Sequence, residues 1–314
     1  MKKSIYVCIK IIAISIVTLV GFGCASINPK PFAGFAESIQ SLRQGADAAL
    51  AIQDEENRVR FIDETVEDMG NPEYAEDAVQ NLLIEGKLFE WKMNRKPLYM
   101  TSKRFRSGVF SLNSALFIYS GLLKELASEE LVDRQKFDKL AKDLNANLMS
   151  AAKALDISDA KRDIALFSVV ASAAAHAYIE SRRQKHLLEA IINNQKQMEI
   201  LSAGLQEAVR ISVRNLRQNY EERSKKLADE FSMNPNMSES KRRSLVETLV
   251  KLNEEFITRL AVMESLHNAY GTLTSAHNEL SEAIKKPELS LSYIAELYEQ
   301  GRHLHKLYKE LGGE

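Results

Sequence analysis

Hydrophobic residues recur along most of this chain at alternating spacings of three and four. The longest such run extends from Leu249 to Ile284, and two others extend from Phe105 to Leu126 and from Met198 to Tyr220. A mean spacing near 3.5 residues places a continuous apolar seam on one face of a helix. Such a seam must be buried against other helices, so the pattern predicts long helices that pack side by side.

Prolines and short polar stretches divide this pattern into separate helices with short connections, which is typical of antiparallel bundles. No stretch alternates with a period of two for long enough to indicate a sheet. We therefore predict an all-α fold, an elongated antiparallel helical bundle with coiled-coil-like packing of long helices. The expected helices cover about 33–68, 73–92, 98–128, 132–155, 159–232, 238–284 and 288–311.

The N-terminus has the layout of an export signal. Three lysines accompany an apolar run from Ile11 to Phe22, and no acidic residue occurs before Glu37. This run is within the length of about 7–15 residues that is usual for the hydrophobic part of a signal peptide. It is shorter than the roughly 20 residues that span a bilayer. The segment that follows, Gly21-Phe22-Gly23-Cys24, resembles the lipidation motif of bacterial lipoproteins.

That resemblance implies that residues 1–23 are a removable signal peptide and that Cys24 is lipidated, which would anchor the chain to a membrane of the cell envelope. Residues 24–32, marked by two prolines, would form a tether. In a cell with two membranes, Ala25 in place of an aspartate implies the outer membrane, facing the periplasm. Two alternatives stay open: ordinary cleavage after Ala25, and an uncleaved membrane anchor.

Residues 33–314 are expected to form one elongated domain, with a candidate subdivision near 129–158. The chain carries 42 lysines and arginines against 43 acidic residues. This balance excludes the strong basic excess of nucleic-acid-binding proteins, so no nucleic-acid partner is expected. Besides Cys24 the chain has one cysteine, Cys8, which lies in the predicted signal. A disulfide is therefore not expected in the exported chain.

Charge is distributed unevenly. Segment 54–85 is rich in acids, whereas segment 87–108 is rich in bases with interleaved aromatic residues. Such a basic and aromatic segment is suited to an anionic membrane or a protein partner. The alternative is that its bases pair with the preceding acidic segment or form a solvated face. The candidate surface comprises Trp91, Lys92, Arg95, Lys96, Lys103, Arg104 and Arg106.

Residues 164–179 are apolar on all sides, with His176 as their one ionisable side chain. A helix of this kind is normally buried on several faces. The functional alternative is a segment that inserts into membranes, as in helical pore-forming proteins.

Candidate chemistry is sparse. Six histidines occur without a His-Glu-x-x-His motif, and phosphate-binding glycine loops and nucleophile elbows are also missing. We therefore expect neither a metal, a cofactor nor a small-molecule substrate. His277 falls on an apolar seam, which favours a hydrogen-bonded core residue over a ligand.

The sequence thus favours a non-enzymatic, lipid-anchored envelope protein that acts as a helical scaffold or adaptor. Its helices would bind a protein partner or a second copy. One alternative is a membrane-active protein that inserts residues 164–179. The other is a ligand-sensing bundle with a pocket between helices.

Overall fold

The computed structural model describes residues 27–71, 98–128, 134–155, 183–286 and 291–310. All the regular secondary structure in these ranges is helical, which confirms the predicted all-α fold. The six helices are α2 (Lys30–Gly70), α4 (Leu98–Ala127), α5 (Arg134–Leu155), α7 (Arg183–Met233), α8 (Glu239–Lys285) and α9 (Ser292–Glu310).

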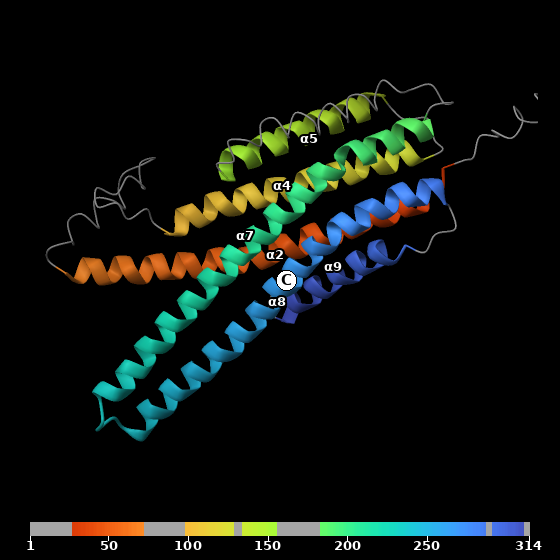
Figure 1. Ribbon diagram of the computed structural model, residues 1–314. Coiled ribbons are helices and arrows are strands. Elements are labelled where there is room, and N and C mark those ends of the chain that lie inside the picture. Colours follow the sequence, from red (N-terminus) through yellow and green to blue (C-terminus); the bar gives the residue numbers. More distant parts are fainter. Residues whose placement is uncertain (1–26, 72–97, 129–133, 156–182, 287–290, 311–314) are drawn as a thin grey trace, which may run out of the picture.

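The helices form an elongated antiparallel bundle (Figure 1). The longest pair is α7 and α8, with 51 and 47 residues, which run antiparallel along each other. Helix α4 runs antiparallel to α2 and carries α5 on its other side, while α9 packs against both α2 and α8. Long helices joined by short connections therefore produce the architecture that the seam pattern predicts.

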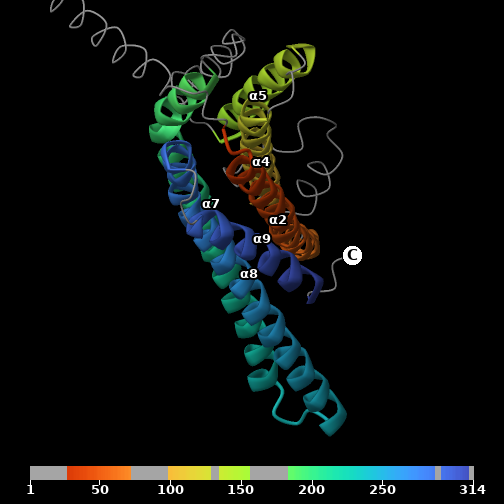
Figure 2. The same cartoon turned by 90° about the vertical axis from the view of Figure 1, so that its right-hand side faces the viewer.

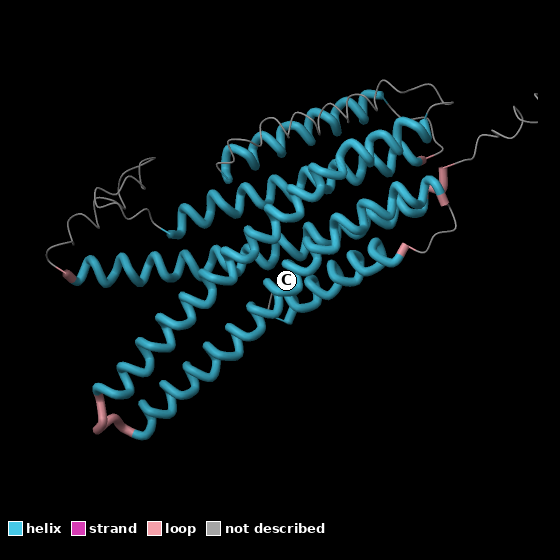
Figure 3. The backbone as a smooth tube through the Cα atoms, viewed as in Figure 1, coloured by secondary structure: helices cyan, strands magenta, loops and turns pink. Residues whose placement is uncertain are grey.

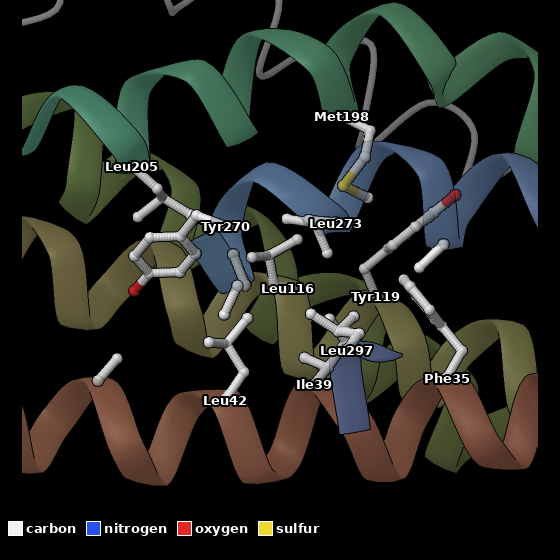
Figure 4. Packing of buried hydrophobic residues seen from close by; sticks show 14 of the residues in the cluster. Phe35, Ile39, Leu42, Leu116, Tyr119, Met198, Leu205, Tyr270, Leu273 and Leu297 are labelled. Carbon is white, nitrogen blue, oxygen red and sulfur yellow. The ribbon is translucent and has the colours of Figure 1, made fainter. Parts of the chain in front are cut away.

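One continuous apolar core includes residues from all six helices. Figure 4 shows Ile39, Leu116, Leu273 and Leu297 converging from α2, α4, α8 and α9. Helix α5, which lies inside the candidate subdivision near 129–158, contributes three buried residues to the same core. These residues are Phe137, Leu144 and Leu148.

Helix α2 begins earlier than expected. It starts at Lys30, so the last residues of the predicted tether 24–32 are helical. The Lys30 amide donates to Oδ1 of Asn28 at 3.1 Å, and the Ala33 amide donates to the Pro29 carbonyl at 3.0 Å. Pro31 fits in this first turn because its missing N–H has no helical partner there and its φ is already helical.

The start of α8 is as predicted. Ser238 is the N-cap, and its Oγ accepts a hydrogen bond from the Lys241 amide at 3.3 Å. The expected helix 73–92, the first part of the expected helix 159–232 and the apolar stretch 164–179 lie outside the described residues. None of the described helices has a stretch that is both long and apolar enough to cross a membrane.

Helices α2 and α9 approach each other closely at two glycines. A Cβ at Gly45 would lie 2.7 Å from Cβ of Leu304, and one at Gly301 would lie 2.8 Å from Cβ of Ser41. Real Cβ atoms do not approach this closely, so these positions require glycine at the present helix separation. The short helix α9 is thereby held against the first half of α2.

The end of the α7–α8 hairpin projects from the bundle as an arm. We define the arm as residues 227–254, which comprise the end of α7, the connection 234–238 and the start of α8 (Figure 3). In Figures 1 and 2 the arm extends beyond α2 and α9. The start of α2 lies at the opposite end of the molecule from the arm. At about 1.5 Å per residue, α7 alone covers on the order of 75 Å of this length.

Candidate functional site

Most of the residues singled out in the sequence lie outside the described part of the chain. Cys24, Trp91, Lys92, Arg95 and Lys96 belong to this group. Lys103 and Arg104 are in α4, but their side chains also fall outside the described part. The roles suggested for these residues remain predictions.

Arg106 is the one residue of the candidate surface whose side chain is described. Its Nη1 lies 2.8 Å from Oδ2 of Asp54 on α2. This ion pair joins the basic segment to the acidic segment. For Arg106 it therefore matches the alternative in which the bases pair with the preceding acidic segment. About three turns earlier on α2, Arg43 lies 3.9 Å from Asp47 and packs over the rings of Phe110 and Phe117 on α4.

A chain of hydrogen bonds runs from the surface of α7 into the core. The Gln195 amide nitrogen donates to Oε1 of Glu199 at 3.4 Å, which leaves Gln195 Oε1 as an acceptor. This oxygen lies 2.8 Å from Nδ1 of His277. Nε2 of His277 lies 2.9 Å from the hydroxyl of Tyr119. Three helices, α4, α7 and α8, are thus joined by one polar chain.

The direction of these bonds fixes the form of His277. Because Gln195 Oε1 can only accept, Nδ1 of His277 carries the proton, and Nε2 accepts from the Tyr119 hydroxyl. The ring is completely buried, and burial lowers the pKa of His277 from 6.5 to about 3. Burial also raises the pKa of Tyr119, while the neighbouring side chain of Asn194 opposes that shift. The pair is therefore neutral near pH 7, and both ring nitrogens of His277 are already engaged in hydrogen bonds.

A second buried polar group lies two turns away on the same helices. The amide nitrogen of Asn113 donates to the Tyr270 hydroxyl at 2.8 Å, and that hydroxyl lies 3.0 Å from Asn113 Oδ1. The Ser202 hydroxyl donates to the Tyr270 carbonyl at 2.6 Å. Burial raises the pKa of Tyr270, so its hydroxyl also stays protonated. These contacts set the register of α4, α7 and α8 rather than form a reactive centre.

Glu279 holds the N-terminus of α9. Its Oε1 accepts from the Ser292 hydroxyl at 3.0 Å and from the Tyr293 amide at 2.9 Å. Its Oε2 accepts from the Ile294 amide at 2.9 Å. A buried carboxylate is favourable here because the first amides of a helix lack intrahelical acceptors and carry partial positive charge.

A groove of about 260 Å³ lies between the second half of α2 and the base of the arm. Its walls carry acidic and basic side chains in equal number, and several of them pair across the groove. Arg60 lies 3.1 Å from Glu222, and Lys226 lies 3.2 Å from Glu67 at its edge. The groove therefore connects α2 to α7 through ion pairs. The lining residues are Glu55, Val59, Arg60, Asp63, Asn219, Glu222, Arg223, Lys226, Glu255 and Arg259.

The arm exposes apolar side chains outside its own seam. Within the arm, Met237 and Leu252 are the two buried side chains. Val246 and Val250 are 53% and 49% exposed, and Ile257 just beyond the arm is 64% exposed. Phe231 and Met233 add two more large exposed side chains near the tip. The arm is thus little covered by the other described helices and exposes four large apolar side chains. The end of α2 exposes four more, namely Val59, Ile62, Val66 and Met69.

Comparison of the chain with protein-family models, with curated proteins and with solved structures finds no match. Among the described residues, no group of three or more histidine, cysteine or acidic side chains could hold a metal ion. Function must therefore be inferred from the signal-like N-terminus and from the arm.

The sequence marked some of these residues and missed others. Tyr119, Tyr270 and His277 are polar residues on predicted seams, and the structure buries all three. No local sequence signal identified Glu279, because its role as a cap depends on residues 292–294 folding back to it. The exposed row on α8 was also missed, although Val246 and Val250 lie outside the seam that starts at Leu249 and Leu252.

Proposed function

We propose that this chain is a lipid-anchored protein of the bacterial cell envelope that acts without catalysis, as a helical scaffold or adaptor. Cys24, directly behind the signal-like apolar run, is the observation that carries this proposal. The helical bundle supports it, because α2 begins six residues after Cys24 and at the opposite end from the arm. An anchor at Cys24 would therefore leave the arm pointing away from the membrane.

The exposed arm supports a role in protein–protein contact. Isolated exposed apolar residues are ordinary on protein surfaces, whereas a cluster on a projecting element is typical of an interaction site. The described polar groups are committed to structure: His277 and Tyr270 are neutral core residues, and Glu279 caps a helix. This favours binding over chemistry as the role of the described part.

Metabolic labelling with a clickable fatty acid tests the anchor. The full chain should incorporate the label, Cys24→Ala should lose it, and Cys8→Ala should keep it as the matched control. Label that persists in Cys24→Ala, or that never appears in the unaltered chain, would rule out the proposed anchor. In a cell with two membranes, fractionation should place the protein in the outer membrane, and Ala25→Asp should move it to the inner one.

The membrane-inserting alternative depends on residues 164–179. Release of a trapped dye from liposomes by the purified chain would favour this alternative, and intact liposomes at micromolar protein would favour the scaffold.

A further inference from the structure

The outer face of α8 in the arm carries a row of four residues that is complementary to itself. Arg242, Val246, Val250 and Glu254 follow one another at intervals of four. Residues four apart lie on one ridge of a helix, and helices commonly pack through such ridges. The ridge therefore carries a base, two apolar residues and an acid in that order along the helix. When a second copy of the ridge runs in the opposite direction, its acid lies opposite the base of the first copy, and its base lies opposite the acid.

We propose that this ridge is a dimerisation surface on which a second copy of the chain packs antiparallel. With the two-fold axis level with residue 248, Val246 of one copy faces Val250 of the other. In the same register Arg242 of one copy faces Glu254 of the other, and both pairs occur twice. A C₂ interface requires this kind of self-complementary surface.

The charges at the two ends are available for such pairing. Two ion pairs form within the arm of one chain: Lys241 lies 3.1 Å from Glu230, and Arg243 lies 3.8 Å from Glu247. Arg242 and Glu254 take part in none of the ion pairs between described residues of the arm. Both side chains are exposed. Ile257 extends the apolar surface one turn beyond Glu254.

The arm provides a firm base for this surface. Where the arm joins the bundle, the Tyr220 ring stacks on Phe256 with the ring centroids 4.2 Å apart, and the Tyr220 hydroxyl donates to Oδ1 of Asn253. These contacts hold the inner face of α8 against α7. The outer ridge is therefore presented in a fixed orientation, with little reorganisation needed on binding.

The size of the surface indicates a weak dimer. Stable interfaces bury a total of about 1,200–2,000 Å², whereas this ridge covers about four helical turns. An antiparallel pair places the two starts of α2 at opposite ends of the dimer, so we expect it between chains free in solution rather than between copies anchored side by side in one membrane. The dimer does not rest on the proposed anchor. Association in solution should therefore be reversible and visible at high protein concentration.

Charge reversal tests both the partner and the direction of pairing. Sedimentation velocity of the full chain in non-ionic detergent should show a monomer–dimer equilibrium in the micromolar range. Arg242→Glu or Glu254→Arg alone places like charges opposite each other twice and should weaken dimerisation roughly tenfold. The double variant restores opposite charges in both pairs and should recover the dimer. Lys225→Glu on α7 is the charge control and should leave the equilibrium unchanged.

The apolar half of the ridge has its own test. Val246→Asp should abolish the dimer, while Val66→Asp on α2, at a valine that is 62% exposed, should not. A chain that stays monomeric up to high micromolar concentrations overturns the proposal. So does a dimer that both single reversals leave unaffected, or one that the double reversal fails to restore. Loss of the fatty-acid label with an intact dimer would overturn the anchor alone, and the converse result would overturn the dimer alone.

Discussion

The hydroxyl of Tyr119 on α4 lies 2.9 Å from Nε2 of His277 on α8, with both side chains fully enclosed in the core. The ring of His277 also lies against Phe35 of α2, at 6.2 Å between centroids. Through Gln195 the same histidine is tied to α7. His277 on α8 therefore contacts three other helices, and its protonation bears on the stability of the whole bundle.

His277 should make the bundle sensitive to acid. In the unfolded chain the ring takes up a proton below about pH 6.5, whereas burial holds its pKa near 3 in the folded chain. The contribution of neutral His277 to the free energy of unfolding is fully present above pH 6.5. It falls as the pH drops towards 3, by up to about 1.4 kcal/mol per pH unit. Urea unfolding should show a loss of about 2 kcal/mol from this group between pH 7 and pH 5.

Variants separate this effect from general acid sensitivity. His277→Gln should be less stable at neutral pH yet should lose less stability on acidification. His303→Gln, at an exposed position on α9, should keep the slope of the unaltered chain. Equal slopes in all three proteins would show that His277 does not control the acid response.

Removing the Tyr119 hydroxyl should leave Nε2 of His277 without a donor. Tyr119→Phe keeps the ring in the core, so the cost should reflect the buried acceptor, about 1–3 kcal/mol. A double-mutant cycle with His277→Leu should show coupling, because Tyr119→Phe should cost less unfolding free energy once the histidine that accepts the hydrogen bond is gone. Additive unfolding energies would contradict a direct bond between the two residues.

The seams were predictable because helix periodicity is a local property of the sequence. The spacing that predicts helices also identified buried positions such as Leu116, Leu205 and Leu273, all of which lie in the core. The caps at helix ends were harder to read. Pro31 fits both a linker and the first turn of a helix, and the structure places it in α2.

Long-range features of the site could not be predicted from the sequence. The role of Glu279 requires α9 to return to the end of α8, and no local pattern fixes that geometry. The ridge on α8 depends on where the bundle ends and the arm begins, because the same side chains would be buried in a wider bundle. Which helices cover each other is a property of the assembled core rather than of any one segment.

Glu279 should control the stability of α9. Glu279→Ala removes three hydrogen bonds at the start of this helix. Glu279→Gln retains one carbonyl oxygen but places an NH₂ group where the other carboxylate oxygen accepts. Hydrogen exchange followed by mass spectrometry should show faster exchange in α9 for both variants, most strongly for alanine. The arm should exchange as before. Unchanged protection of α9 would mean that its packing on α2 holds it without the carboxylate.

The close approach of α2 and α9 predicts that a glycine-to-alanine substitution changes the free energy of unfolding in opposite directions at different positions. A methyl group at Gly301 would meet Cβ of Ser41 at 2.8 Å and the backbone nitrogen of Leu42 at 3.0 Å. Since a backbone atom cannot yield without moving the helix, Gly301→Ala should destabilise the chain by about 1–3 kcal/mol. Thermal and urea unfolding of the full chain measure this loss.

Gly204 provides the matched control. It lies inside α7 with nothing within 4 Å of a Cβ at its position. Gly204→Ala should therefore stabilise the chain by about 0.5–1 kcal/mol, since alanine loses less backbone entropy in a helix. The same substitution thus lowers stability at Gly301 and raises it at Gly204. Gains at both positions would show that α9 can move away from α2 at little cost, and losses at both would show that α7 at Gly204 is covered by part of the chain outside the described residues.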